Sequence, residues 1–404
     1  MVSLSHVDII FIGGGAAGFF AAIHAAEKNK HRHILILEAN KRVLSKVLIS
    51  GGGRCNVTSS IFKPKELVQY YPRGHNYLLK PFQVFNSADT QTWFKSQGVQ
   101  LKTEADGRVF PVSDDSNTIV DALVKRAQQL GIHIETSSRV VSFEKQGEEW
   151  SVETTGNTYK CNKLVVAGGG NKQLWAQLSK LDISIVSPVP SLFTFKITAP
   201  LLEDMAGISL PNVQTWLAGG KLKHQGPILI THEGLSGPAT LKLSAWAARE
   251  LFEADYKALV HVNWLGLSFD EVKAVIQDAQ STQPKKHVQS TPLFNIPKRF
   301  WKQLCTLAGI PEQRNYAEIG KKQINPLIEL LTNSKISVDG KSTNKDEFVT
   351  AGGVDLEDIN LESFEVKKHP TLYIIGEALN IDAVTGGFNF QGAWTTGYLA
   401  GRSL

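Results

Sequence analysis

The sequence predicts an α/β protein built around a Rossmann-like dinucleotide-binding domain. Three observations support this fold class: a glycine cluster directly behind an apolar run, an acid that closes the next apolar run, and apolar strands that alternate with helices over the first 190 residues. Strand, glycine turn, helix, second strand and terminal acid in this order are much more specific than glycines alone. We therefore expect a bound dinucleotide.

The glycine cluster follows the apolar run Val7–Ile12. Gly13 permits the sharp turn, Gly15 leaves room for a pyrophosphate against the backbone, and Gly18 lets the next helix pack on the strand. The N–H groups at the start of that helix carry partial positive charge toward the phosphates. Glu38 closes the second apolar run, where a carboxylate can accept hydrogen bonds from a ribose. The predicted contacts are Gly13, Gly15, Ala16, Ala17, Gly18 and Glu38.

A second glycine-rich segment lies at residues 46–58, where three adjacent glycines precede Arg-Cys-Asn. This pattern predicts a backbone nest with a fixed cation and an amide, suited to a flat polar ring or a pyrophosphate. We expect Cys55 to be a small buried side chain beside the cofactor rather than a reactive thiolate. The predicted contacts in this segment are Lys46, Gly52, Gly53, Arg54, Cys55 and Asn56.

A third glycine-rich segment follows the last apolar strand, residues 372–375, and leads to a helix expected over residues 391–401. The N-terminus of that helix suits a flavin carbonyl, which gains negative charge on reduction. The alternative is that these glycines only form turns. The predicted contacts are Gly376, Glu377, Gly386, Gly387, Phe388, Asn389 and Gln391, and Val140, Ala167, Gly168 and Gly169 complete the cofactor set.

The pattern along the chain predicts a discontinuous nucleotide domain, residues 1–190 with 346–404. Between its parts we expect a β-barrel-like substrate domain, residues 191–267 with 334–345, and a helical insertion at residues 268–333. A meander at residues 139–160 should precede a separate buried strand at residues 164–167. A domain built from both ends lets the terminal segment return to the cofactor.

Composition excludes several classes of protein. The 404 residues are 42% hydrophobic and 20% charged, without a run suited to crossing a membrane or a secretory signal. Three isolated cysteines favour a reducing compartment, by default the cytoplasm, and predict neither a metal site nor a dithiol relay. Residues 271–345 contain 12 Lys and Arg against 6 Asp and Glu, so they carry the basic excess of the chain.

These blocks closely resemble the BaiN/RdsA family of NAD(P)/FAD-dependent oxidoreductases, over nearly the whole chain. The resemblance rests on the three glycine segments, on residues 107–113 and 350–354, and on the Thr-His-Glu-Gly-Leu-Ser-Gly-Pro segment at residues 231–238. It implies a FAD-binding two-dinucleotide-type fold with an inserted flattened β-barrel and a small helical domain. This chain has Asn380 and Ala383 where the family usually has an acid and a glycine, and Ser45 where a glycine is common; Asp382 is retained.

The family's activities include reduction of carbon–carbon double bonds in steroid-type substrates, oxidation of small amines, and reduction of ribosomal RNA uridine to dihydrouridine. The sequence holds one complete dinucleotide fingerprint, so we expect FAD to bind tightly and NAD(P)H to visit as a transient reductant. His232 is the candidate catalytic residue, because Gly234 and Gly237 would let its loop approach the flavin; a histidine that only hydrogen-bonds within its loop is the alternative.

The basic insertion decides among the substrate classes. It mixes cations with aromatic residues, notably in Lys298–Lys302, as an RNA-facing surface does. The leading hypothesis is therefore a uridine reductase acting on ribosomal RNA. A solvated lysine-rich surface on a small-molecule reductase or amine oxidase is the enzymatic alternative. A flavin redox sensor or RNA-binding assembly factor is the non-enzymatic one.

Overall fold

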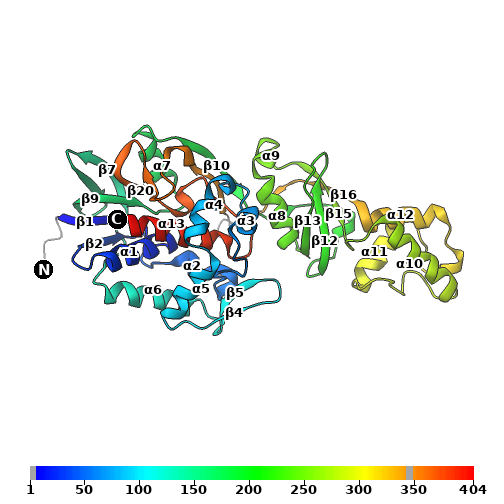
Figure 1. Ribbon diagram of the computed structural model, residues 1–404. Helices are drawn as coiled ribbons and strands as arrows, with labels where there is room; N and C mark the ends of the chain where they lie inside the picture. Colours follow the sequence, from blue (N-terminus) through cyan, green and yellow to red (C-terminus); the bar gives the residue numbers. More distant parts are fainter. Residues whose placement is uncertain (1–5, 343–348) are drawn as a thin grey trace. The chain divides into compact units, whose positions relative to one another are not determined.

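The computed structural model describes residues 6–342 and 349–404. The chain separates into two compact units (Figure 1). Unit 1 consists of Met1–Val189 with Val349–Leu404, and unit 2 consists of Pro190–Phe348. Unit 1 therefore contains both ends of the chain. The finer division of unit 2 at residues 268 and 333 stays a prediction.

Unit 1 is built on a sheet whose main path runs β19-β20-β9-β1-β2-β6. The neighbours from β20 to β6 pair in parallel, and β2 and residues 9–12 of β1 are runs of buried apolar residues, as expected for strands buried on both faces. The strands are β1 (His6–Ile12), β2 (Ile34–Leu37), β6 (His133–Glu135), β9 (Thr158–Val166), β19 (Glu365–Val366) and β20 (His369–Ile374).

Strand β9 corrects the predicted break between the meander and the buried strand. It runs without interruption because its residues 158–161 pair antiparallel with β8 (Glu149–Thr154) while its residues 160–166 pair parallel with β1. Strand β7 (Val140–Gln146) completes the meander by pairing with β8. One strand thus joins the meander to the parallel sheet.

The two ends of unit 1 meet where helix α1 (Ala16–Lys28) packs along helix α13 (Phe388–Ser403), as Figure 1 shows. The approach is close: a Cβ on Gly401 would lie 2.5 Å from the Ala21 oxygen. Helix α13 begins three residues before the expected start at Gln391, so Phe388 and Asn389 lie in its first turn rather than in a loop.

The remaining elements of unit 1 cover and extend the sheet. The helices are α2 (Ser45–Gly53), α3 (Pro64–Leu67), α4 (His75–Val84), α5 (Ser87–Ser96), α6 (Asn117–Gln129) and α7 (Lys172–Ser179). Two smaller sheets contain β3 (Thr58–Ser59), β4 (Leu101–Thr103) and β5 (Arg108–Pro111), and β10 (Ile185–Ser191) with β18 (Val349–Val354).

Unit 2 contains a seven-stranded sheet with order β16-β15-β12-β13-β14-β11-β17, and the barrel-like domain stays a prediction. Its inner face packs on helix α8 (Pro238–Trp246). The Thr215 hydroxyl on this face donates a hydrogen bond to the Ala239 oxygen of α8. The strands are β11 (Phe195–Lys196), β12 (Ser209–Leu217), β13 (His224–Ile230), β14 (Gly234–Ser236), β15 (Ala258–Asn263), β16 (Ser334–Val338) and β17 (Gly340–Lys341).

A helical part completes unit 2, and its apolar residues form one core with the inner face of the sheet. The helices are α9 (Ala248–Glu253), α10 (Phe269–Thr282), α11 (Lys298–Leu307) and α12 (Lys321–Asn333). None of the helices in the described ranges, 6–342 and 349–404, combines the length and apolar character needed to cross a membrane.

Candidate functional site

The first glycine loop has the shape that a pyrophosphate needs. Gly13 has a φ of +113°, and a Cβ there would lie 2.6 Å from the Ala167 oxygen. A Cβ on Gly18 would lie 2.1 Å from the Gly13 oxygen. At Gly15, in contrast, an added Cβ meets no atom within 4 Å, and no side chain caps α1. Gly13 and Gly18 therefore serve packing, whereas Gly15 keeps space open at the helix N-terminus.

Glu38 turns its carboxylate toward this loop. One oxygen accepts the Gly14 N–H at 2.9 Å, and the other accepts the backbone and side-chain N–H groups of Asn40 at 2.9 and 2.8 Å. Because a carboxylate has about four acceptor positions, capacity remains for a ribose hydroxyl. The Ser138 N–H donates to the Glu38 backbone oxygen at 2.9 Å, which brings the segment before Val140 to the same end of the sheet.

The second glycine segment forms the predicted nest within and after helix α2. Gly51, Gly52 and Gly53 have φ values of +58°, +69° and +84°, and added Cβ atoms at Gly52 and Gly53 would meet nothing within 4 Å. Such successive N–H groups form a concave site for anions. Cys55 is fully buried, and burial raises the pKa of its thiol to about 12. Its side chain is thus a neutral packing group at neutral pH.

Arg54 is held by acids of its own unit. Its guanidinium donates to Glu104 at 2.7 Å and to Asp114 at 3.4 Å, and it lies 4.1 Å from the centroid of the Phe110 ring. The Glu104 hydrogen bond, with the nearby charges of Glu104 and Asp114, raises the pKa of Arg54. The guanidinium therefore positions the nest by attaching it to strand β5 and the loops around that strand.

Asn56 joins the second glycine segment to the third. It is buried, and its amide, oriented to satisfy its neighbours, accepts the Gly387 N–H at 2.9 Å and donates to the Thr58 oxygen at 2.9 Å. Gly387 has a φ of +85°, and a Cβ there would lie 2.6 Å from the Thr58 oxygen. Gly387 also starts helix α13 without a side-chain cap. The nest and the N-terminus of α13 therefore belong to one site.

The side chains predicted around this terminus have protein partners. The Asn389 amide makes two hydrogen bonds of 2.9 Å with the backbone of Ala383. The Gln391 side chain is fully buried and accepts from Thr58 and Thr90 at 2.6 and 2.9 Å. Both amides hold the loop in place, and the Gln391 N–H also donates to the Gly387 oxygen at 3.0 Å, so Gln391 supports the site rather than contacting a ligand.

Lys46, Glu377 and the residues after β9 are also brought together. Lys46 forms an ion pair of 2.5 Å with Glu377, whose other oxygen accepts the Thr350 N–H at 3.2 Å. A Cβ on Gly376 would lie 2.8 Å from that of Ala17. The remaining contacts are those of Ala167, whose N–H donates to the Ile12 oxygen at 2.8 Å, of Gly168, which packs on Leu174, and of Gly169, which faces Glu377.

Sequence reasoning missed two features at this end of unit 1. Arg73 forms an ion pair with Asp382, whose side chain is fully buried beside Ala383. The Tyr70 ring stacks on Phe388, with centroids 4.3 Å apart and an interplanar angle of 15°. Asp382 was visible as an acid within a glycine-rich segment, but its partner comes from 309 positions earlier in the chain. No local pattern could have supplied that pairing.

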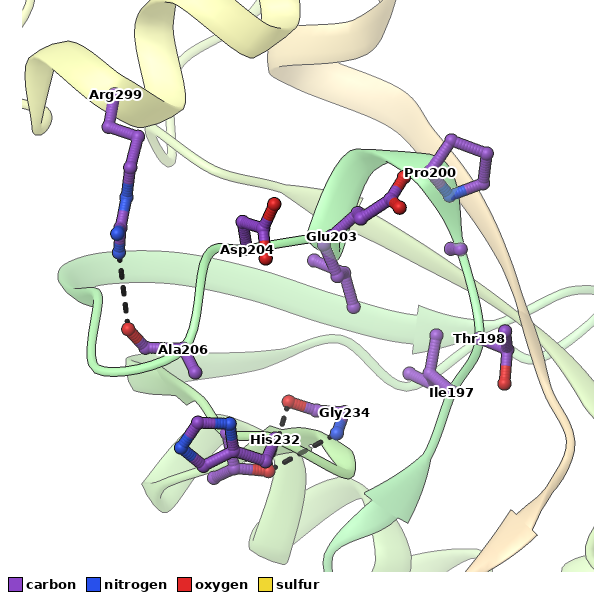
Figure 2. A pocket seen from close by; sticks show the side chains of 12 residues that line it. Ile197, Thr198, Pro200, Glu203, Asp204, Ala206, His232, Gly234 and Arg299 are labelled. Carbon is purple, nitrogen blue, oxygen red and sulfur yellow. Dashed lines mark hydrogen bonds between the residues drawn. The ribbon is translucent and has the colours of Figure 1, made fainter.

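His232 lies in unit 2, in the turn between β13 and β14. The turn is closed by Thr231, whose N–H donates to the Gly234 oxygen at 2.8 Å and whose hydroxyl accepts the Gly234 N–H at 3.2 Å. His232 is exposed and lines a surface pocket of about 860 Å³. In Figure 2 Ala206 lies between Arg299 and the His232 imidazole. The Arg299 guanidinium donates to the Ala206 oxygen at 3.2 Å. Glu203 and Asp204 also line the pocket.

The aromatic residues of the basic insertion are not a stacking surface. Phe300 and Trp301 are fully buried; Phe300 packs edge-on against Trp264, and Trp301 donates to the Val288 oxygen at 2.7 Å. The expectation of interleaved cations and aromatic rings on α11 is therefore wrong. The aromatic positions follow the helical period and form its apolar face, while Lys298 and Lys302 lie on the exposed face.

Comparisons with known proteins agree with this geometry. The family model described as HI0933-like protein Rossmann domain matches residues 7–403. The chain is 28% identical to a ribosomal RNA dihydrouridine synthase of Escherichia coli (strain K12), over 99% of this chain and 98% of that protein. It is 25% identical to a 3-dehydro-bile acid delta(4,6)-reductase of Clostridium scindens, over 97% of both.

Solved structures share the fold at low sequence identity. A flavocytochrome c3 fumarate reductase matches with a TM-score of 0.51 and 14% identity, over 98% of this chain and 78% of that one. A 3-ketosteroid-delta4-(5alpha)-dehydrogenase from Rhodococcus jostii RHA1 matches with a TM-score of 0.52 and 14% identity, over 98% and 96%. The predicted fold class is confirmed: this is the α/β Rossmann fold of FAD-binding flavoproteins.

Proposed function

The chain belongs to the HI0933-like family of FAD-dependent oxidoreductases, and we propose that it reduces uridine in ribosomal RNA to dihydrouridine with NAD(P)H as the electron source. The relatives named ribosomal RNA dihydrouridine synthase, from Escherichia coli and Haemophilus influenzae, support this substrate. The net reaction adds a hydride equivalent from NAD(P)H and a proton across one carbon–carbon double bond, so atoms and electrons balance.

The residues of unit 1 fit FAD. Gly15 leaves open space where a pyrophosphate would lie, and Glu38 has acceptor capacity for the ribose. The nest at Gly52 and Gly53 and the uncapped start of α13 would hold the flavin end through backbone N–H groups. Bound FAD supplies hydride transfer, and the chain supplies binding and orientation. NAD(P)H is proposed to visit transiently, because the sequence holds one complete fingerprint.

The observation that carries the RNA substrate is a group of four lysines at one end of the helical part, which we call the lysine cluster: Lys285, Lys286, Lys321 and Lys322. All four are exposed, and none forms an ion pair with any residue in the described part of the chain. Two other cations of the insertion do have acidic partners, since Lys302 pairs with Glu312 at 2.6 Å and Arg314 lies 3.9 Å from Glu318. Free cations attract phosphates without a competing internal carboxylate.

Backbone hydrogen bonds gather the lysine cluster from two segments. The Tyr316 N–H donates to the Lys286 oxygen at 3.1 Å, and the Ala317 N–H donates to the Pro284 oxygen at 3.1 Å. The Gln280 side chain bridges to the Ile319 oxygen at 2.9 Å, two residues before α12 begins. The turn after α10 and the start of α12 therefore lie side by side, where the α12 dipole adds to the positive potential.

Reduction of a small enone is a second candidate, favoured by the relative named a bile acid reductase and by the pocket in unit 2. Under either function we propose His232 as the polar group that acts on the substrate. The His232→Ala variant should keep bound FAD and lose most turnover; full turnover would remove the imidazole from the mechanism. The three buried free cysteines suit work in the cytoplasm.

Mass spectrometry of ribosomal RNA from a strain lacking the gene tests the proposed substrate. We expect one dihydrouridine to disappear, and to return when the natural gene is supplied but not with a variant that carries glutamate at all four lysines of the cluster. Unchanged dihydrouridine in the deletion strain would overturn the proposal. Consumption of an enone by the same purified protein would then favour the second candidate.

A further inference from the structure

A row of aromatic and cationic side chains stands on the outer face of the seven-stranded sheet. Trp216 of β12 and His261 of β15 are cross-strand partners, with ring centroids 5.2 Å apart and an interplanar angle of 19°. The Lys223 ammonium lies 4.4 Å from the centroid of the Trp216 ring. Lys335 of β16 is the cross-strand partner of His261. We call these four residues the aromatic row.

The aromatic row faces away from the core of unit 2. On β12 the side chains of Val213, Thr215 and Leu217 are buried on the inner face, and Trp216 takes the alternate position. Leu229 and Leu259 are 41% and 39% exposed on the neighbouring strands, which adds apolar surface around the row. Within the described ranges, neither Lys223 nor Lys335 forms an ion pair. The row is therefore a half-exposed apolar surface with two free cations.

Cross-strand stacking alone gives an incomplete account of this surface. Stacked pairs and cations over rings do stabilise sheets. Large aromatic side chains contribute most to stability when they are buried, however, and Trp150, Trp264, Trp301 and Trp394 are all fully buried here. Trp216 instead remains partly exposed on a face that α8 does not cover. Aromatic rings on a sheet face flanked by cations are the arrangement that binds unpaired bases.

We propose that the aromatic row binds single-stranded RNA, with a base stacked on Trp216 and phosphates on Lys223 and Lys335; this rests on the proposed function and names a second contact with its substrate. A cation over an exposed ring contributes less than a stacked base. A base can therefore replace the Lys223 ammonium on the ring, and the released ammonium then pairs with the adjacent phosphate.

The aromatic row and the lysine cluster lie at opposite ends of α12. The cluster includes the first two residues of this helix, whereas Lys335 lies two residues beyond its end. Thirteen helical residues rise about 20 Å, so one RNA strand can contact both. The cluster would supply charge that is independent of sequence, and the row would select unpaired bases over duplex.

The test compares RNA binding by three variants of the FAD-loaded full chain. The probe is a fluorescein-labelled oligouridylate of roughly 10 nucleotides, a length typical of single-strand sites, with a duplex of equal length beside it. Trp216→Leu should raise the dissociation constant for the single strand roughly 5- to 100-fold, because leucine keeps apolar area without a stacking face. Trp216→Phe should restore most of the affinity. Phe252→Ala, which removes another aromatic ring, 50% exposed in unit 2, should bind as the natural chain does.

The outcomes separate this inference from the proposed function. Equal affinity of the natural chain and Trp216→Leu for the single strand would overturn the aromatic row, even if dihydrouridine is still formed. A loss of affinity that phenylalanine does not rescue, accompanied by a lower melting temperature, would assign Trp216 to sheet stability and also overturn it. Binding that depends on Trp216 in a protein that forms no dihydrouridine would support the row and contradict the proposed substrate.

Discussion

The two units differ in the groups that make their proposed contacts: backbone groups in unit 1 and side chains in unit 2. In unit 1 the proposed cofactor contacts are mostly backbone groups. Side chains such as Arg54, Asn389 and Gln391 form intramolecular hydrogen bonds that hold the loops in place. In unit 2 the proposed substrate contacts are exposed or half-exposed side chains on well-packed elements. A backbone site is vulnerable to a single added methyl group, whereas a surface of charges is weakened gradually. The predictions below test this difference.

The largest effect is expected from the glycines of the first loop. Gly18→Ala should lower the free energy of unfolding by about 3 kcal/mol or more, because the new Cβ would lie 2.1 Å from the Gly13 oxygen. Thermal unfolding with and without added FAD measures this loss.

Gly15→Ala is the matched control for that loop. Its added Cβ meets no protein atom and its φ of −91° suits alanine, so the apoprotein should be as stable as the natural one. Because the methyl group occupies the space proposed for the pyrophosphate, bound flavin should nevertheless be lost. Retention of FAD by Gly15→Ala would place the pyrophosphate elsewhere.

Charge reversal of the lysine cluster should weaken RNA binding by roughly 100-fold at low salt. The slope of log Kd against log salt should fall by about 0.7 for each phosphate that the protein no longer neutralises. Anisotropy titrations over a series of salt concentrations measure both quantities. Reversal of Lys302 with Glu312, which already form an ion pair, is the control and should leave affinity nearly unchanged. The exchange of Lys302 and Glu312 leaves the net charge unchanged, so an equal reduction of affinity in both variants would contradict a site specific to the lysine cluster.

Glu38→Gln should weaken FAD binding by about 10-fold, as expected when a charged acceptor is replaced by a neutral one. The amide oxygen can still accept the Gly14 N–H, whereas the amide NH₂ group then faces the two N–H donors of Asn40, so the stability of the apoprotein is measured beside the affinity. Fluorescence titration of the apoprotein with FAD measures the change. Unchanged affinity would mean that Glu38 only supports the glycine loop through its contacts with Gly14 and Asn40.

The smallest effect is expected at Cys55. Burial raises the pKa of this thiol from 9.0 to about 12, so the folded state favours the protonated form. The associated stability is present below pH 9 and is lost as pH rises from about 9 to about 12, with a loss of roughly 1 kcal/mol by pH 10. The free energy of unfolding, measured with denaturant over this pH range, should fall less steeply in Cys55→Ala than in the natural chain. Parallel profiles would contradict a buried neutral thiol.

Local pattern predicted most of unit 1. The glycines at residues 13–18 and the acid at residue 38 predict the geometry of the first loop, because a tight turn and a close backbone approach require these residue types in that order. Helix α13 starts earlier than the pattern predicts because Gly387 is its N-cap. Strand β9 is longer than predicted because it pairs with β8 along its first residues and with β1 from Lys160 on.

Pattern was weaker in unit 2, where function depends on which face of an element is exposed. Phe300 and Trp301 lie within a basic segment but are part of the core, whereas no pattern around Trp216 indicates that it stands on the outer face of the sheet. The lysine cluster joins residues more than 30 positions apart through backbone hydrogen bonds that no local signal encodes. Side-chain surfaces of this kind require the packed structure.

The most direct test is anaerobic reduction of the FAD-loaded protein by NADPH, followed by mixing with a ribosomal RNA transcript, an enone or oxygen. The account predicts that the transcript restores the absorbance of oxidised flavin fastest and acquires dihydrouridine, and that reversal of the lysine cluster abolishes this advantage. Rapid re-oxidation by the enone with no dihydrouridine in the transcript would contradict the account.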